Sequence, residues 1–162
     1  MNKKNKISAL VFSIYILLTF YVFGGGMVTS LVGYRIWKWV GPNEFPKFHQ
    51  ADNAHIIPVF VIFFFLSFIP QVLLFWFRPT AIPKWMVWIG LLFNLTMLIS
   101  SITIQIPIQL KLDEGFSMEL IERLISTDLT FRIIPMILLA VTNFIMLYKV
   151  VRRSDSWTHP SR

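Results

Sequence analysis

The chain has 162 residues, of which 56% are hydrophobic and 14% are charged, and its formal charge is +7. Soluble domains usually contain about 45–50% apolar and roughly 25% charged residues, so this composition excludes an ordinary water-soluble fold. The chain has no cysteine, which excludes disulfides, iron–sulfur clusters and thiol chemistry.

Four segments are apolar enough to cross a bilayer as helices, since a span needs about 20 such residues. They cover about 8–32, 56–77, 85–106 and 133–151. The sequence therefore predicts an all-α integral membrane four-helix bundle, with residues 1–162 forming a single membrane domain. The apolar run of the first segment is too long for a signal peptide, so we expect it to be retained.

The first span is rich in small residues near its end: Gly24, Gly25, Gly26, Thr29, Ser30 and Gly33. In lipid, small residues let helices approach closely, so these positions favour tight helix packing. The alternative is that the glycines leave room for a flat ligand beside the helix.

The connection before the second span, near 33–55, is polar and has helical signals. If its last part is helical, His49, Asp52 and His55 form a staggered row on one face. Neutral histidine is the usual general base near neutral pH, so His49 and Asp52 are candidate catalytic residues. We expect Glu44 and His55 to bind substrate beside them.

Asp52-x-x-His55 also resembles half of a carboxylate-bridged di-iron site. The second half is missing, because the remaining histidine, His159, belongs to the opposite side of the membrane. A mononuclear metal at His49 and His55 is an alternative. The favoured interpretation is that the protein needs no cofactor and binds no metal.

The third span ends in a run of polar residues that leads into Gln105, Pro107 and Gln109. The two glutamines are therefore candidate substrate-binding residues at the same membrane face. Within the spans, Asn94 and Asn143 are expected to form hydrogen bonds between helices, the usual role of amides in lipid.

The connection near 107–132 is also expected to be partly helical, with Ser117 capping a helix that starts at Met118. Asp128 and Arg132 are four residues apart, so they can pair on one helix face. One interpretation is an ion pair on the surface. The other is that Arg132 is catalytic and binds an oxyanion of the substrate, with Asp128 beside it. We expect a kink or break near Pro135.

Basic residues predict the orientation of the bundle. One side carries nine of them: Lys3, Lys4, Lys6, Arg78, Lys84, Lys149, Arg152, Arg153 and Arg162. The other side carries six: Arg35, Lys38, Lys47, Lys111, Arg123 and Arg132. This distribution predicts a multi-pass protein of the cell membrane with both termini in the cytoplasm. The basic residues flank apolar spans and form no stripe with aromatic residues, so we expect a lipid bilayer and no nucleic acid as the partner.

Several of these segments resemble the anthrone oxygenase-like family, small four-helix membrane proteins long catalogued as a domain of unknown function. The resemblance covers roughly 10–150 and rests on four short stretches. They are the glycines 24–26, Glu44-Phe45-Pro46-Lys47-Phe48-His49-Gln50, Gln105-Ile106-Pro107-Ile108-Gln109-Leu110 and Asp128-Leu129-Thr130-Phe131-Arg132. Where the family typically reads Asn-x-Pro-x-Asn, this chain has Gln105 and Gln109, and it lacks the Trp or Asn often found near the arginine.

The resemblance implies cofactor-independent insertion of oxygen into polycyclic anthrones. Gln105, Gln109 and Arg132 would line the pocket, with His49 as the base. The predicted function is therefore a polar pocket at the extracytoplasmic face that binds a hydrophobic small molecule, aromatic if the resemblance holds. An oxidoreductase of the anthrone oxygenase type is one interpretation. The alternative is a non-catalytic membrane binder, transporter component or accessory subunit. The spans lack the ionisable residues expected of a proton or ion relay, which makes a transporter less favoured than a binder or accessory subunit.

Overall fold

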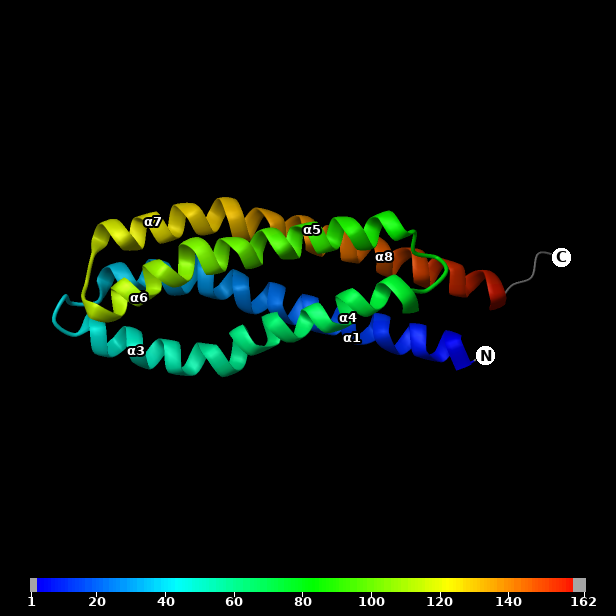
Figure 1. Ribbon diagram of the computed structural model, residues 1–162, viewed down its shortest axis with the longest axis horizontal. Coiled ribbons are helices and arrows are strands. Elements are labelled where there is room, and N and C mark those ends of the chain that lie inside the picture. The colour runs from blue at the N-terminus through cyan, green and yellow to red at the C-terminus, as the bar shows by residue number, and fades with distance from the viewer. Residues whose placement is uncertain (1–2, 159–162) are drawn as a thin grey trace.

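The computed structural model describes residues 3–158, with side chains described as far as Arg153. In these residues four long helices, Lys3–Trp39, Phe45–Phe77, Lys84–Glu114 and Met118–Arg153, are each long and apolar enough to cross a membrane. They pack as a bundle without strands (Figure 1). The predicted fold class is confirmed, and each helix contains one of the predicted spans. His159 and Arg162 lie outside the described residues.

Every long helix consists of α-helical parts joined by one π-helical turn. The first contains α1 (Lys3–Val28), η1 (Thr29–Gly33), α2 (Tyr34–Ile36) and the 3₁₀ turn η2 (Trp37–Trp39). The second contains α3 (Phe45–Ile56), η3 (Ile57–Val61) and α4 (Ile62–Phe77). The third contains α5 (Lys84–Ser100), η4 (Ser101–Gln105) and α6 (Ile106–Glu114). The fourth contains α7 (Met118–Asp128), η5 (Leu129–Ile133) and α8 (Ile134–Thr158).

The helices form a square in which α1 packs against α4 and α8, and α5 packs against the same two helices. The start of α1, the end of α8 and the connection 78–83 lie at one end of the bundle (Figure 1). The connections 40–44 and 115–117 lie at the other end, which we call the distal end. The predicted polar connections are thus mostly helical extensions of the spans, and the third helix continues past Pro107 to Glu114.

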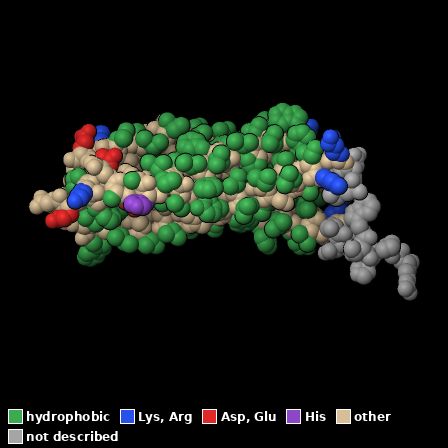
Figure 2. Space-filling model, turned by 90° about the horizontal axis from the view of Figure 1, so that it is seen from below, with side chains coloured by type: hydrophobic (Ala, Val, Ile, Leu, Met, Phe, Trp, Pro, Cys, Tyr) green, Lys and Arg blue, Asp and Glu red, His purple; other side chains and the backbone are tan. Residues whose placement is uncertain are grey.

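The outer surface of the bundle is apolar along its length. Figure 2 shows hydrophobic side chains over the middle of the molecule and charged side chains gathered at the two ends. Only 28–33% of the most apolar stretch of each helix is buried inside the bundle. The remainder faces outward and requires lipid, because apolar surface on this scale is not stable in water. The chain is an integral membrane protein.

The π turns coincide with prolines in three of the four helices. Pro58 lies in η3, while Pro107 and Pro135 follow closely after η4 and η5. A proline ring collides with the carbonyl one turn earlier, and a π turn relieves that collision while the backbone stays hydrogen-bonded, as lipid requires. The break expected near Pro135 is therefore a local widening, and the fourth helix continues through it. Ser117 caps α7 as predicted, accepting from the Leu120 amide at 3.3 Å.

Two glycines of α1 allow the first helix to approach its neighbours. A Cβ at Gly26 would lie 2.7 Å from Sδ of Met136, and one at Gly25 would lie 3.0 Å from the Phe60 ring. A Cβ at Gly24 would meet nothing within 4 Å. Tight packing is therefore confirmed at Gly25 and Gly26, where Phe60 and Met136 occupy the space beside the helix.

Replacing Gly26 by valine is expected to lower the free energy of unfolding by about 1–3 kcal/mol, the usual effect of overpacking a well-filled interior. Gly24→Val is the matched control, because it adds the same side chain to the same helix facing outward. Thermal unfolding in one detergent compares the two variants. Equal midpoints would contradict the role of Gly26 in packing.

Candidate functional site

His49 is completely buried at the distal end, with none of its surface exposed. It lies on α3, whose first turn contains Pro46, a position at which proline favours a helix start. The imidazole ring stacks on Phe45 with centroids 5.4 Å apart and meets the edge of Trp37 at 4.6 Å. These two aromatic rings separate the histidine from lipid and water.

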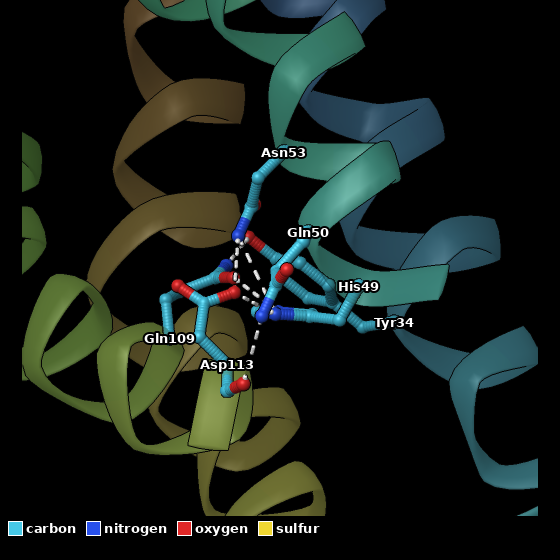
Figure 3. Close-up of polar contacts among 6 residues, drawn as sticks. All are labelled: Tyr34, His49, Gln50, Asn53, Gln109 and Asp113. Atoms are coloured by element: carbon cyan, nitrogen blue, oxygen red, sulfur yellow. Dashed lines mark hydrogen bonds and ion pairs between the residues drawn. The ribbon is translucent and has the colours of Figure 1, made fainter. Parts of the chain in front are cut away.

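Both ring nitrogens of His49 have partners on α6 (Figure 3). Nδ1 lies 2.7 Å from Oδ1 of Asp113, and Nε2 lies 2.9 Å from Oε1 of Gln109. Gln109 and Asp113 are four residues apart, so both face α3 from one side of their helix. Asn53 donates to the same Asp113 oxygen at 3.2 Å, and Gln50 donates to the backbone carbonyl of Asp113 at 3.2 Å.

The network continues inward through Tyr34 on α2. The Tyr34 hydroxyl oxygen accepts from Nε2 of Gln109 at 3.3 Å and from Nη1 of Arg132 at 3.2 Å. The same Nη1 lies 3.0 Å from Oδ1 of Asp128. A continuous row of polar side chains thus runs from Asp113 to Asp128 and draws on all four long helices. We call this row the distal relay; its six members are Asp113, His49, Gln109, Tyr34, Arg132 and Asp128.

The distal relay can satisfy His49 in either charge state. With the Gln109 oxygen facing Nε2, both ring nitrogens donate, which requires the imidazolium. If the amide turns by half a rotation, its NH₂ donates to Nε2 of a neutral ring, and the Tyr34 hydroxyl donates to the amide oxygen. Amide orientation is set by the hydrogen-bond network rather than by atomic positions. Both ring nitrogens of His49 therefore have a partner in either orientation of the Gln109 amide.

The Asp128–Arg132 pair forms as predicted, but it is not on the surface. The side chains are only 1% and 14% exposed. Charged groups inside a membrane bundle are costly and usually functional. The pair lies on the fourth helix just before the predicted span 133–151, where α7 meets η5.

Four predicted site residues lie apart from the distal relay. Gln105 is buried and accepts from the Ser100 hydroxyl at 2.8 Å. Glu44 and His55 are exposed, and Nδ1 of His55 lies 2.6 Å from the carbonyl of Ala51. Asp52 is half-buried, and the carboxylate on His49 is that of Asp113.

The structure gives other partners to the two histidines, His49 and His55, of the metal alternative. Both nitrogens of His49 contact side chains of α6, and Nδ1 of His55 lies beside its own backbone. Within residues 3–153, no group of three or more histidine, aspartate or glutamate side chains is arranged to hold a metal ion.

Sequence reasoning missed Tyr34 and Asp113. Tyr34 follows Ser30 by four residues and extends the small-residue face of the first helix. Asp113 follows Gln109 by four residues. A helical extension of each span by two turns would have placed both side chains on the face already occupied by predicted site residues.

A second polar cluster lies deeper, in the half of the bundle nearer the termini. The Tyr15 hydroxyl donates to Asn143 at 2.7 Å, and the Asn143 amide donates to the Thr19 hydroxyl at 3.1 Å. Asn94 donates to Gln71 at 2.7 Å. Asn94 and Asn143 thus bond between helices, which confirms the prediction made for them.

Comparison with known proteins adds no relative: no family model, no curated protein and no solved structure matches this chain.

Proposed function

We propose that the distal relay binds a lipid-soluble weak acid, an aromatic ketone with an acidic C–H bond, and oxidises it with molecular oxygen. The reaction is that of the anthrone oxygenase-like family, which the sequence resembles. The excess of basic residues at the terminal end supports an orientation with the termini in the cytoplasm and the distal site outside. The substrate reaches the site from the bilayer, where such molecules partition.

One observation carries this proposal: a buried histidine paired with a carboxylate, and joined through one amide to a tyrosine and an arginine. Asp113 accepts from Nδ1 of His49, so Nε2 is the nitrogen that can take a proton. A base oriented by a second group is the usual arrangement for general base catalysis. Tyr34 and Arg132 supply donors on the other side of Gln109, where negative charge on oxygen would be stabilised.

The chemistry balances with oxygen as the only co-reactant. The substrate displaces Gln109 from Nε2, and His49 takes one C–H proton while the Gln109 amide and Tyr34 donate to the enolate oxygen. The carbanion adds O₂, forming a C–O bond, and His49 returns its proton to the peroxide. Loss of the second C–H proton breaks the O–O bond and releases water. A CH₂ group becomes a ketone, and the two oxygen atoms end in the ketone and in water.

The closed arrangement of the site favours a second candidate, a non-catalytic binder or accessory subunit. Phe45 and Trp37 cover His49, and a cavity beside Arg132 offers only about 20 Å³ to the centres of water-sized molecules. An anthrone enters only if the aromatic cover opens. A binder needs the same opening but consumes no oxygen, so turnover separates the two candidates.

The test uses anthrone itself with the full-length protein in lipid nanodiscs. We expect uptake of one O₂ for each anthraquinone formed. Absorbance measures the anthraquinone, an oxygen electrode measures the O₂, and a native mass spectrum should show bound product. Heat-unfolded protein in the same nanodiscs gives the spontaneous rate. If anthrone binds but is oxidised only at the spontaneous rate, the non-catalytic binder is the remaining candidate. If anthrone neither binds nor is oxidised faster than the spontaneous rate, the proposal is overturned.

A further inference from the structure

Three of the four π turns meet at one internal cavity. It is lined by Ser30 of η1, Phe60 of η3 and Arg132 of η5, together with Val22, Phe64, Met97 and Met136. The remaining π turn, η4, packs against α7 and contributes the buried Gln105. We call this cavity the chamber. π turns occur often at functional sites.

Four buried polar atoms have no hydrogen-bond partner among the described residues: Oγ of Ser30, Nε2 of Gln105, and both carboxylate oxygens of Asp128. Ser30 and Arg132 line the chamber, and Asp128 interacts with both of them. The ion pair with Arg132 balances the charge of Asp128 but gives neither oxygen a well-directed hydrogen bond. An unsatisfied buried polar group costs about 1–3 kcal/mol. The Ser30 hydroxyl lies beside the Asp128 carboxylate, but one hydroxyl cannot satisfy both carboxylate oxygens, so a further partner is needed at the chamber.

The size of the chamber identifies that partner. About 20 Å³ is open to the centres of water-sized molecules, and a site for one water needs about 10–15 Å³ on this measure. Buried waters typically have two to four polar partners, which the Ser30 hydroxyl, the Asp128 carboxylate and the Arg132 guanidinium can supply. A cation is disfavoured, because the Arg132 guanidinium already lies 3.0 Å from Asp128.

A second cavity continues from the chamber toward the middle of the bundle. It shares Val22, Met97 and Met136 with the chamber, and its polar lining includes Thr19, Ser67, Asn94 and Asn143. The shared residues form the partition between the two spaces. Two of them are methionines, whose flexible side chains change rotamer readily. Sδ of Met136 packs where a Cβ at Gly26 would lie, so the first helix limits its movement.

We propose that the bundle contains a hydrated path: water occupies the chamber and extends, past Met97 and Met136, to the deeper amide cluster. This water exchanges with the outside at the distal end when the packed side chains of the distal relay move apart. Asp113, with a side chain 31% exposed, is the member of the distal relay at which this exchange begins. The path would supply Asp128 and the distal relay with exchangeable protons from outside the bilayer. It does not depend on the proposed oxidation, and its test involves no substrate.

The lack of cysteine makes thiol reactivity a direct test. Ser30→Cys introduces one thiol at the chamber, and Ser13→Cys introduces one on the lipid-facing side of the same helix. Folded protein in nanodiscs is exposed to Ag⁺ in chloride-free buffer, then quenched, unfolded and titrated with maleimide. The lipid-facing site raises the pKa of the S13C thiol, and each unit of increase lowers the fraction of reactive thiolate tenfold. We therefore expect the S30C variant to be modified at least about tenfold faster than S13C.

The partition is tested with a thiol beyond it. Ser67→Cys lies at the second cavity and is expected to react slowly, and adding Met136→Ala should accelerate it by about tenfold on the same basis. Met146→Ala is the control, because Met146 is buried in a different cluster and lines neither cavity. Reaction of S30C no faster than S13C would overturn the hydrated chamber. Equal rates for S67C with and without M136A would overturn the continuous path.

Discussion

Replacing Arg132 by methionine is expected to lower the free energy of unfolding by about 3–5 kcal/mol, the usual result of leaving a buried charge without its partner. The Asp128 carboxylate is 1% exposed and would lose its only nearby guanidinium in the described residues. Tyr34 would also lose a donor to its hydroxyl oxygen. Denaturant or thermal unfolding in a fixed detergent measures the change.

The double variant Asp128→Leu with Arg132→Met separates the pair from general damage at this position. Removing both charges avoids the isolated carboxylate, so it should recover most of the stability, as replacing buried ion pairs by apolar residues often does. Arg123→Met, at an exposed position on α7, is the matched control and should change stability little. A double variant as unstable as the sum of the single variants would mean that the two charges are not coupled.

The spans were predictable because lipid imposes a simple rule on sequence. A helix that crosses a bilayer must be apolar over about 20 residues, and the four segments met that requirement without ambiguity. The boundaries were less predictable. Pro107 suggested an end to the third span, but the helix continues through η4 and α6 to Glu114, since a wide turn accommodates the proline at little cost to the backbone.

The site was predictable only as far as neighbouring residues on one helix could reveal it. The spacing of Asp128 and Arg132 fixed their pairing, because residues four apart share a helix face. The spacing of His49, Asp52 and His55 suggested a partner for the histidine on its own helix, whereas the carboxylate comes from α6, 64 residues away in the chain. Which face of α6 meets α3 depends on the packing of the whole bundle, and no local pattern encodes it.

The same limit explains Tyr34. Aromatic residues near the ends of spans usually mark the membrane interface, so a tyrosine at this position does not by itself indicate a polar site. Its role follows from a position between Gln109 and Arg132, which belong to two other helices. A polar relay assembled from four helices has no signature in any one segment of sequence.

If the site oxidises anthrone, His49→Gln is expected to reduce kcat by about 10²–10⁴, the usual contribution of a general base. Glutamine retains a polar side chain that can bond to Asp113 or Gln109, so the fold should be less disturbed than with alanine. Product formation is followed in nanodiscs under air. His55→Gln is the matched control, because it makes the same substitution on the same helix at an exposed position, and its rate should equal that of the wild type.

Asp113→Asn tests how His49 is oriented rather than whether it is needed. The carboxylate accepts from Nδ1 and so leaves Nε2 free to take a proton. An asparagine amide that donates to Nδ1 would stabilise the opposite tautomer, with the proton on Nε2, where it blocks the reaction. We therefore expect kcat to fall while KM changes little, with an altered dependence of kcat on pH. If H49Q and H55Q lose activity equally, or if D113N raises KM alone, then His49 acts in binding or folding, and the base must be sought elsewhere in the distal relay.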